Sequence, residues 1–150
     1  MRITFIILSL FFFFGCQTYS EDDLSQFDTE IQKYIEKEQL DMEKLESGLY
    51  YSILSDTTGG ELIRYTDQVT FYYSGEFLSG EVFQEIPKDA PLTFKVKELI
   101  AGWQEGLMQL HGPGTIQLII PPSLGYGSKN TEKIPPNTIL YYELTVTDIK

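Results

Sequence analysis

Cysteine, histidine and positive charge are all scarce in this sequence. Its 150 residues contain one cysteine, Cys16, and one histidine, His111. A single cysteine excludes an internal disulfide and a cysteine-based metal site, and so few imidazole and thiolate ligands predict that the chain binds no metal. With 11 basic residues against 22 acidic ones, the formal net charge is −11. Such a surface repels nucleic acid and anionic lipid headgroups, so we expect no nucleic-acid partner.

The residue sets that carry acid, base or nucleophilic chemistry are missing as well. There is no Gly-x-Ser-x-Gly motif, and His111 lies in the turn-like His111-Gly112-Pro113-Gly114, where we expect a surface position. The segment Gly125-Tyr126-Gly127 lacks the lysine and Ser/Thr of a phosphate-binding loop. No pair of carboxylates stands in an apolar context that would separate their pKa values. We therefore predict recognition through shape and apolar surface, or catalysis without acid, base, nucleophile or cofactor.

The N-terminus carries a hydrophobic run that is too short to span a membrane. Arg2 precedes about 12 mostly apolar residues, whereas a spanning helix needs about 20. Residues 1–15 are therefore predicted to be a signal peptide. The run ends in Phe14-Gly15-Cys16, which resembles the lipobox of bacterial lipoproteins, whose cysteine is lipidated and becomes the new N-terminus. An ordinary cleaved leader with an incidental cysteine and an uncleaved anchor are the alternatives.

A lipid on Cys16 would explain how an acidic chain stays at a membrane, because acyl chains bind through buried CH₂ groups rather than through charge. The resemblance to lipoproteins implies a place in the bacterial cell envelope. Gln17 follows the cysteine, where an acidic residue is associated with inner-membrane retention in some bacteria. This indicates a lipid-anchored protein of the outer membrane that faces the periplasm.

The rest of the chain divides into a short N-terminal part and one larger domain. The acidic segment 17–27 is predicted to be a solvated tether. Residues 28–46 are predicted to be helical, with Asp28 or Thr29 as the N-cap. We therefore expect a lipidated tether and helix at residues 16–46, followed by the folded domain at residues 47–150.

From residue 47 onward the sequence has the pattern of strands. Strands are predicted at residues 49–54, 69–73, 116–120 and 139–147. In the last of these, one face should be buried, comprising Leu140, Tyr142, Leu144 and Val146. One convincing helix, which carries Trp103, interrupts the strands. The predicted fold is α+β: a curved antiparallel β-sheet of about five strands wrapped around one short helix, with an N-terminal helical extension.

The helix with the single tryptophan carries the strongest hint of a site. Apolar residues recur there at helical spacing, which predicts one apolar side made of Leu99, Ile100, Trp103 and Leu107. Gly102 and Gly106 each destabilise a helix by about 1 kcal/mol relative to alanine, which indicates close approach of another backbone or a ligand. Trp103 is then expected to form the floor of an apolar pocket. The alternative is that Trp103 simply fills the core.

Five motifs follow one another along the domain. They are Tyr73-Ser74-Gly75, Gly80-Glu81-Val82-Phe83, Leu99-Ile100-Ala101-Gly102-Trp103-Gln104-Glu105-Gly106, Pro122-Ser123-Leu124-Gly125-Tyr126-Gly127 and Ile134-Pro135-Pro136-Asn137-Thr138-Ile139-Leu140. In this order and at this spacing they resemble the FKBP-type peptidyl-prolyl cis-trans isomerases over about residues 47–149, which implies the FKBP-like fold. Together with the lipobox and the helix before Ser47, the whole chain resembles the lipoprotein isomerases associated with bacterial gliding motility.

The resemblance implies a hydrophobic pocket that binds an X-Pro segment and speeds its cis/trans interconversion. It assigns catalytic roles to Phe83, Gln84, Trp103 and Tyr126, with Trp103 under the proline ring and Tyr126 donating its hydroxyl to the substrate carbonyl. It assigns substrate binding to Tyr73, Leu92, Leu99, Ile100, Ile134 and Tyr142. The implied partners are proline-containing polypeptides of the cell envelope.

One of these residues departs from the family pattern. After the pocket phenylalanine the family usually has an aspartate, but Phe83 is followed by Gln84. An amide forms hydrogen bonds without carrying the charge, which predicts reduced turnover. Two functions therefore stay open. The first is an isomerase that assists folding of exported or envelope proteins. The second is a proline-segment-binding module or chaperone with little turnover.

Overall fold

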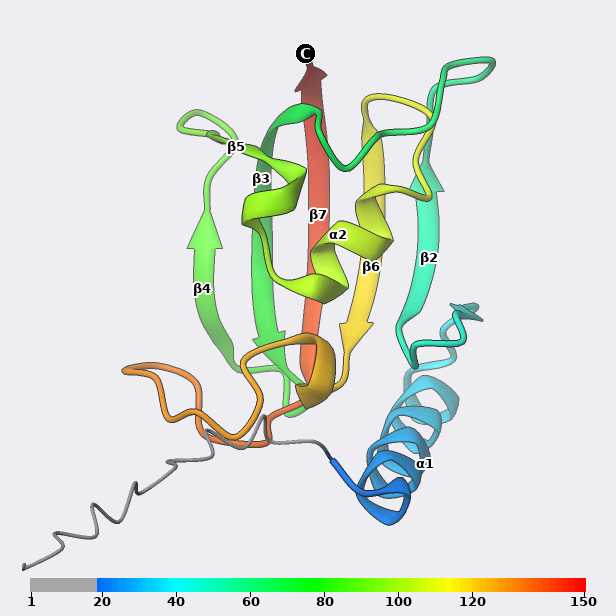
Figure 1. The fold of residues 1–150 in the computed structure, drawn as a ribbon, viewed down its shortest axis with the longest axis vertical. Coiled ribbons are helices and arrows are strands. Elements are labelled where there is room, and N and C mark those ends of the chain that lie inside the picture. Colours follow the sequence, from blue (N-terminus) through cyan, green and yellow to red (C-terminus); the bar gives the residue numbers. More distant parts are fainter. Residues whose placement is uncertain (1–18) are drawn as a thin grey trace, which may run out of the picture.

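The computed structural model describes residues 19–150, which form a seven-stranded antiparallel sheet with helices on both of its faces (Figure 1). The signal peptide predicted at residues 1–15, Cys16 and the first residues of the predicted tether lie outside the described residues. The strands run in the order β1-β2-β6-β7-β3-β4, and β5 also pairs with β3. They are β1 (Glu43–Lys44), β2 (Tyr50–Ser55), β3 (Gln68–Phe77), β4 (Val82–Ile86), β5 (Leu92–Lys95), β6 (Gly114–Ile120) and β7 (Leu140–Ile149).

The centre of the sheet is the part that the sequence predicted best. β7 pairs with β3 on one side and β6 on the other, and its burial alternates along the strand. The concave face of β7 is buried as expected, through Leu140, Tyr142, Leu144 and Val146. The α+β fold around one short helix is confirmed, and the sheet gains three short strands, β1, β4 and β5, that the periodicity did not resolve. Strands of two to five residues are too short to show a clear alternation.

The short helix α2 (Ala101–Leu107) lies against the concave face of the sheet (Figure 1). Its glycines permit close packing on β6, because a Cβ at Gly102 would lie 2.6 Å from the Ile120 side chain and one at Gly106 would lie 2.4 Å from Leu118. The close approach is confirmed, but the neighbours are side chains rather than a backbone or ligand. The expectation that Leu99 and Ile100 share a helix face with Trp103 is wrong. A 3₁₀ turn, η1 (Val96–Glu98), ends before them, and both have extended backbone.

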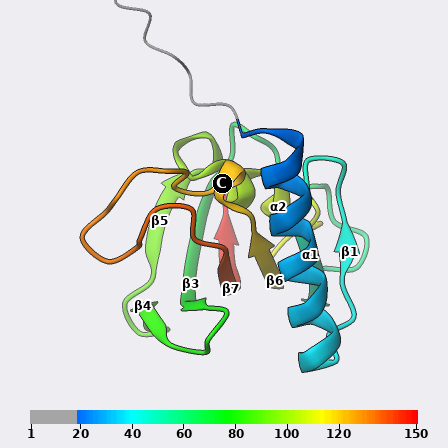
Figure 2. The ribbon, with the colours of Figure 1, turned by 90° about the horizontal axis from the view of Figure 1, so that it is seen from below.

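The N-terminal helix α1 (Glu21–Glu38) covers the opposite, convex face beside β6 and β1 (Figure 2). It begins earlier and ends earlier than the predicted helix 28–46, so most of the predicted tether is helical. Ser20 is the N-cap in place of Asp28 or Thr29, and it forms a capping box with Asp23. The acidic run that suggested a solvated tether forms the first turn, where negative charge is stabilised by the helix dipole. Gln39, with φ 55°, ends the helix.

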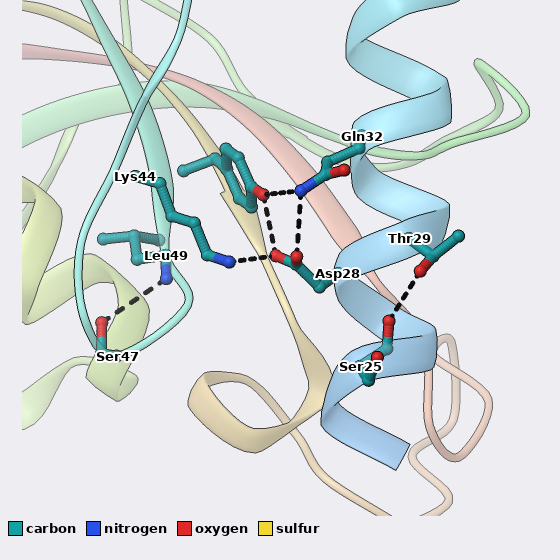
Figure 3. Close-up of polar contacts among 8 residues, drawn as sticks. Ser25, Asp28, Thr29, Gln32, Lys44, Ser47 and Leu49 are labelled. Atoms are coloured by element: carbon teal, nitrogen blue, oxygen red, sulfur yellow. Dashed lines mark hydrogen bonds and ion pairs between the residues drawn. The ribbon is translucent and has the colours of Figure 1, made fainter. Parts of the chain in front are cut away.

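A small cluster of apolar and polar contacts joins α1 to the sheet. Ile31 is 1% exposed and packs with Tyr50 of β2, Ile119 of β6 and Ile139, the residue before β7. Beside them, the Asp28 carboxylate lies 2.5 Å from Lys44 Nζ and accepts a 2.7 Å hydrogen bond from the Tyr50 hydroxyl (Figure 3). Burial opposes ionisation, but the bonds from Lys44 and Tyr50 hold the pKa of Asp28 below its usual range.

Within the described part of the chain, no helix has the length and apolar character needed to cross a membrane.

Candidate active site

A cavity of about 300 Å³ opens on the concave face, between α2 and the β3–β4–β5 side of the sheet. Its lining is mostly aromatic and aliphatic, with Glu98 the single carboxylate among the described residues that line it. The lining residues are Phe71, Tyr73, Gln84, Leu92, Phe94, Glu98, Leu99, Ile100, Trp103, Tyr126 and Tyr142. This volume is at the lower end of the range for small-ligand pockets, about 300–1,000 Å³, so it suits a short apolar group.

Trp103 forms the floor of this cavity and is held by aromatic edges on three sides. Its ring centroid lies 5.2 Å from Phe71, 4.8 Å from Tyr73 and 5.0 Å from Tyr142, each in a T-shaped arrangement. The residue is 5% exposed, and its buried Nε1 has no hydrogen-bond partner among the residues described. Edge-to-face contacts add about 0.5–1.5 kcal/mol each beyond area burial. The indole plane is therefore fixed before any ligand arrives, and Trp103 serves both the core and the cavity.

A β-bulge brings two consecutive residues of β4 to the concave side. Gly75 pairs with Gln84 and Glu76 pairs with Val82, so Phe83 is the extra residue. Phe83 packs on Tyr142 at 5.7 Å between ring centroids, while Gln84 lines the cavity. Gly75 makes room for both rings, because a Cβ there would lie 2.7 Å from Tyr142 and 2.8 Å from Phe83.

Three tyrosines add hydroxyl groups to the apolar lining. Burial raises the pKa of Tyr73 to about 12, with a further contribution from Tyr126. Burial, followed by the neighbouring Tyr126 and Tyr73, raises the pKa of Tyr142 still further. These two groups therefore stay protonated at neutral pH and act as neutral hydrogen-bond donors rather than as bases.

Tyr126 is placed by a tight turn between two glycines. It follows the 3₁₀ turn η2 (Pro122–Leu124), whose Pro122 carbonyl accepts bonds from Gly125 N at 3.1 Å and Gly127 N at 2.9 Å. The φ of Gly127 is 66°, a value that favours glycine. This double anchoring holds Tyr126, half-buried, in the cavity wall.

The turn between η1 and α2 supplies the wall opposite β4. The Leu99 carbonyl accepts a 2.7 Å bond from Gln104 Nε2, and the Ile100 carbonyl accepts 3.0 Å and 3.1 Å bonds from the backbone N–H groups of residues 103 and 104. These bonds hold the backbone of both residues, which line the cavity although neither belongs to the helix proper.

The structure brings most of the sequence-predicted site residues together in this lining. Phe83 and Ile134 are the exceptions: Phe83 packs on Phe77 and Tyr142, and Ile134 is 5% exposed within the main core. Sequence reasoning missed Phe71, Phe94 and Glu98. Alternation would have found the first two, since Phe71 is two residues from Tyr73 on β3, and Phe94 is two residues from Leu92 on β5. Glu98 immediately precedes Leu99.

The remaining sequence predictions concern charged and metal-binding residues. Within residues 19–150, no group of three or more His, Cys, Asp or Glu residues is arranged to hold a metal ion. His111 is exposed, as predicted, and its Nδ1 lies 2.9 Å from Asp56 Oδ2 in the turn before β6. It is not part of the cavity lining.

A curved antiparallel sheet with a tryptophan-floored cavity under one short helix defines the FKBP-like class of domains. The sequence model described as "FKBP-type peptidyl-prolyl cis-trans isomerase" matches residues 59–147. This chain belongs to that family.

Relatives support the same assignment. The chain is 41% identical over 108 residues to the FKBP-type peptidyl-prolyl cis-trans isomerase FkpA of Buchnera aphidicola subsp. Schizaphis graminum, which covers 71% of this chain and 43% of that protein. It is 31% identical over 139 residues to FkpA of Escherichia coli, covering 91% and 51% respectively. The crystal structure of FkpA from Escherichia coli superposes with a TM-score of 0.73, covering 87% of this chain and 62% of that one. The chain thus spans about half the length of the curated relatives it matches.

Proposed function

We propose that this chain is a peptidyl-prolyl cis-trans isomerase that assists folding of proline-containing polypeptides of the cell envelope. The observation that carries the proposal is the aromatic cavity floored by Trp103 and flanked by Tyr126. Membership of the isomerase family supports it.

The apolar lining of the cavity suits the chemistry of cis/trans isomerisation. Rotation about a peptide bond faces a barrier of about 18–20 kcal/mol, because resonance gives the C–N bond partial double-bond character. The twisted transition state has lost that resonance, so the amide is less dipolar and needs less water around it. An apolar cavity therefore disfavours the planar ground state more than the twisted state, and each 1.4 kcal/mol of that difference gives about a tenfold acceleration.

The tyrosine hydroxyls in the lining have roles that need no proton transfer. The Tyr126 hydroxyl donates a hydrogen bond to the substrate carbonyl, and the raised pKa values of Tyr73 and Tyr142 keep their hydroxyls neutral. Trp103 supports the proline ring, and the wall residues Leu92, Leu99 and Ile100 exclude water. Phe83 supports the lining by packing on Tyr142, and Ile134 lies in the surrounding core.

The test is exchange NMR on a short X-Pro peptide with and without the chain. We expect faster cis/trans exchange with the wild type and slower exchange with Tyr142→Phe, whose ring stays while its cavity hydroxyl is lost. Tyr141→Phe is the matched control, because Tyr141 is the next residue in β7 and packs on the opposite face with α1. Equal exchange with and without wild-type chain would refute the isomerase.

Gln84 supports a second candidate function, a binding module or chaperone with little turnover. It lines the cavity where the family usually places a carboxylate, and it brings no charge to that wall. Saturable binding of an X-Pro peptide that is blocked by Trp103→Leu, with no effect on the exchange rate, would favour this function.

We also propose that a lipid on Cys16 anchors the chain to the outer membrane, facing the periplasm, as in the gliding-motility lipoproteins it resembles. Tyr19, the first described residue, is three residues from Cys16, a distance of at most about 10 Å of extended chain. Such an anchor would hold the end of the domain that contains α1's first turn close to the bilayer. Mass spectrometry of the N-terminal peptide tests the lipid, with Cys16→Ser as the control that should release the chain from membranes.

A further inference from the structure

Tyr19 makes a long-range contact that the proposed catalytic mechanism does not use. Its hydroxyl donates a 2.7 Å hydrogen bond to the Asn137 side-chain oxygen, 118 positions further along the chain. Its ring packs edge-on against Phe27 of α1, with centroids 5.3 Å apart. Burial, and then the charge of Asp23, raise the pKa of Tyr19, so the hydroxyl is a stable donor at neutral pH. Tyr19 is therefore fixed on one side by α1 and bound on the other to the loop after Tyr126.

Asn137 closes the base of that loop, residues 127–137. Its backbone N–H donates a 2.8 Å bond to the Gly127 carbonyl, and its φ of 57° lies in the left-handed region that asparagine tolerates. A Cβ at Gly127 would lie 3.8 Å from the Tyr19 hydroxyl, so all three residues meet at one point. Gly127 follows Tyr126 directly. Whatever holds Asn137 in place therefore also restrains the backbone next to Tyr126.

The arrangement of the elements agrees with this path. The start of α1 and the segment between β6 and β7 lie at the same end of the molecule, opposite to the C-terminus (Figure 1). A second bond restrains the backbone next to Tyr126: Gly127 N donates to the Pro122 carbonyl in the preceding 3₁₀ turn. Through Tyr19, which packs on Phe27 of α1, the Tyr19–Asn137 bond ties this end of the loop to the N-terminal helix.

We propose that Tyr19 is a positioning residue for the cavity: by binding Asn137 it closes the loop 127–137 and keeps Tyr126 in its binding-competent position. Without the bond, part of the population has an open loop base and a displaced Tyr126. The apparent affinity for the substrate falls in proportion to the fraction of molecules with a closed loop, while the bound complex is unchanged. Loss of Tyr19's hydroxyl should thus raise KM and leave kcat unchanged.

The first test uses the full-length chain in detergent, with Tyr19→Phe, which keeps the ring contact with Phe27. We expect KM for an X-Pro peptide to rise about threefold with kcat unchanged, and the Asn137 amide to exchange with solvent at least threefold faster. Tyr51→Phe is the matched control, because it removes a comparable 2.8 Å bond, to Glu43, elsewhere on the sheet. A purely structural role of the Tyr19 bond would lower Tm and speed Asn137 exchange but leave KM unchanged.

The second test perturbs the other partner. Asn137→Asp keeps both the acceptor oxygen and the left-handed backbone, so it should behave as wild type. Asn137→Gly keeps the backbone but loses the acceptor, so it should match Tyr19→Phe, with no further change in the double variant. Additive effects of Tyr19→Phe and Asn137→Gly, or unchanged Asn137 exchange in Tyr19→Phe, would overturn the proposal.

The KM readout rests on the proposed isomerase function, whereas amide exchange does not. If the wild type failed to speed isomerisation, the proposed function would fall. Asn137 exchange and the Tyr126 ring signals of the same variants would then decide the positioning role by themselves.

Discussion

The two faces of the sheet are filled by different kinds of side chain. On the convex face, α1 packs on the sheet through the buried Ile31, and the Asp28 network satisfies the polar groups beside it. On the concave face, α2 has only seven residues and leaves an aromatic cavity of about 300 Å³ uncovered. Neighbours in β7 show the difference directly, because Tyr141 packs with α1 while Tyr142 lines the cavity. One face contributes stability, and the other combines stability with binding.

The largest effect is expected from the cavity floor. Trp103→Leu removes the ring that three aromatic edges contact, so it should lower isomerase activity at least thirtyfold, equivalent to about 2 kcal/mol of transition-state stabilisation. Stability should fall too, by about 3 kcal/mol or more. Exchange NMR and urea unfolding measure the two effects. A variant that folds and keeps full activity would show that the cavity is not the site.

The matching change on the convex face should separate stability from activity. Ile31→Ala leaves a void under α1 and should destabilise the chain by about 2–5 kcal/mol. At temperatures where the variant is still folded, its kcat/KM should equal that of the wild type. A large fall in kcat/KM of the folded variant would show that the packing of Ile31 also supports the cavity.

Tyr126→Phe should have a smaller effect, limited to catalysis. The ring remains in the cavity wall, and one hydrogen bond to the substrate carbonyl is lost, so we expect about a tenfold fall in kcat/KM. Thermal unfolding should be unchanged, since the side chain is half-buried. Tyr65→Phe, at a tyrosine that is 51% exposed and outside the lining, is the control for a general effect of hydroxyl removal.

The Asp28 network should make stability depend on pH. The pKa of Asp28 is lower in the folded chain than its ordinary value of 3.8, so its stabilisation is present above that value and is lost as pH falls through the folded pKa. Asp28→Asn should destabilise the chain by about 1 kcal/mol at neutral pH, and the difference should shrink in acid below pH 3.8. Urea unfolding at several pH values measures it. A difference that is constant with pH would contradict the assigned role.

The smallest expected effect concerns Gln84. Gln84→Asp restores the carboxylate that the family usually has in this wall, and we expect turnover to rise about two- to threefold. Glu85→Asp is the matched control, because Glu85 is exposed on the other side of the same strand. Unchanged turnover in Gln84→Asp would show that Gln84 does not slow the enzyme.

The sequence predicted the sheet centre and most of the cavity because both rest on local patterns. The alternation of Leu140, Tyr142, Leu144 and Val146 fixes one face of β7, and the motif order identified the lining. The start of α1 was missed because Glu21, Asp22 and Asp23 carry no apolar periodicity, and their role as a capping turn depends on Ser20. The inward turn of both Phe83 and Gln84 depends on a bulge in strand pairing, which is a tertiary feature that no local pattern encodes.

The most direct test of the account uses the fact that the chain has a single tryptophan. Its indole gives one side-chain N–H signal, which reports on the cavity floor alone. Titration with an X-Pro peptide should shift this signal in step with faster cis/trans exchange, whereas an alanine analogue of the peptide should leave it unmoved. Accelerated exchange with an unchanged Trp103 signal would place the chemistry elsewhere and contradict the account.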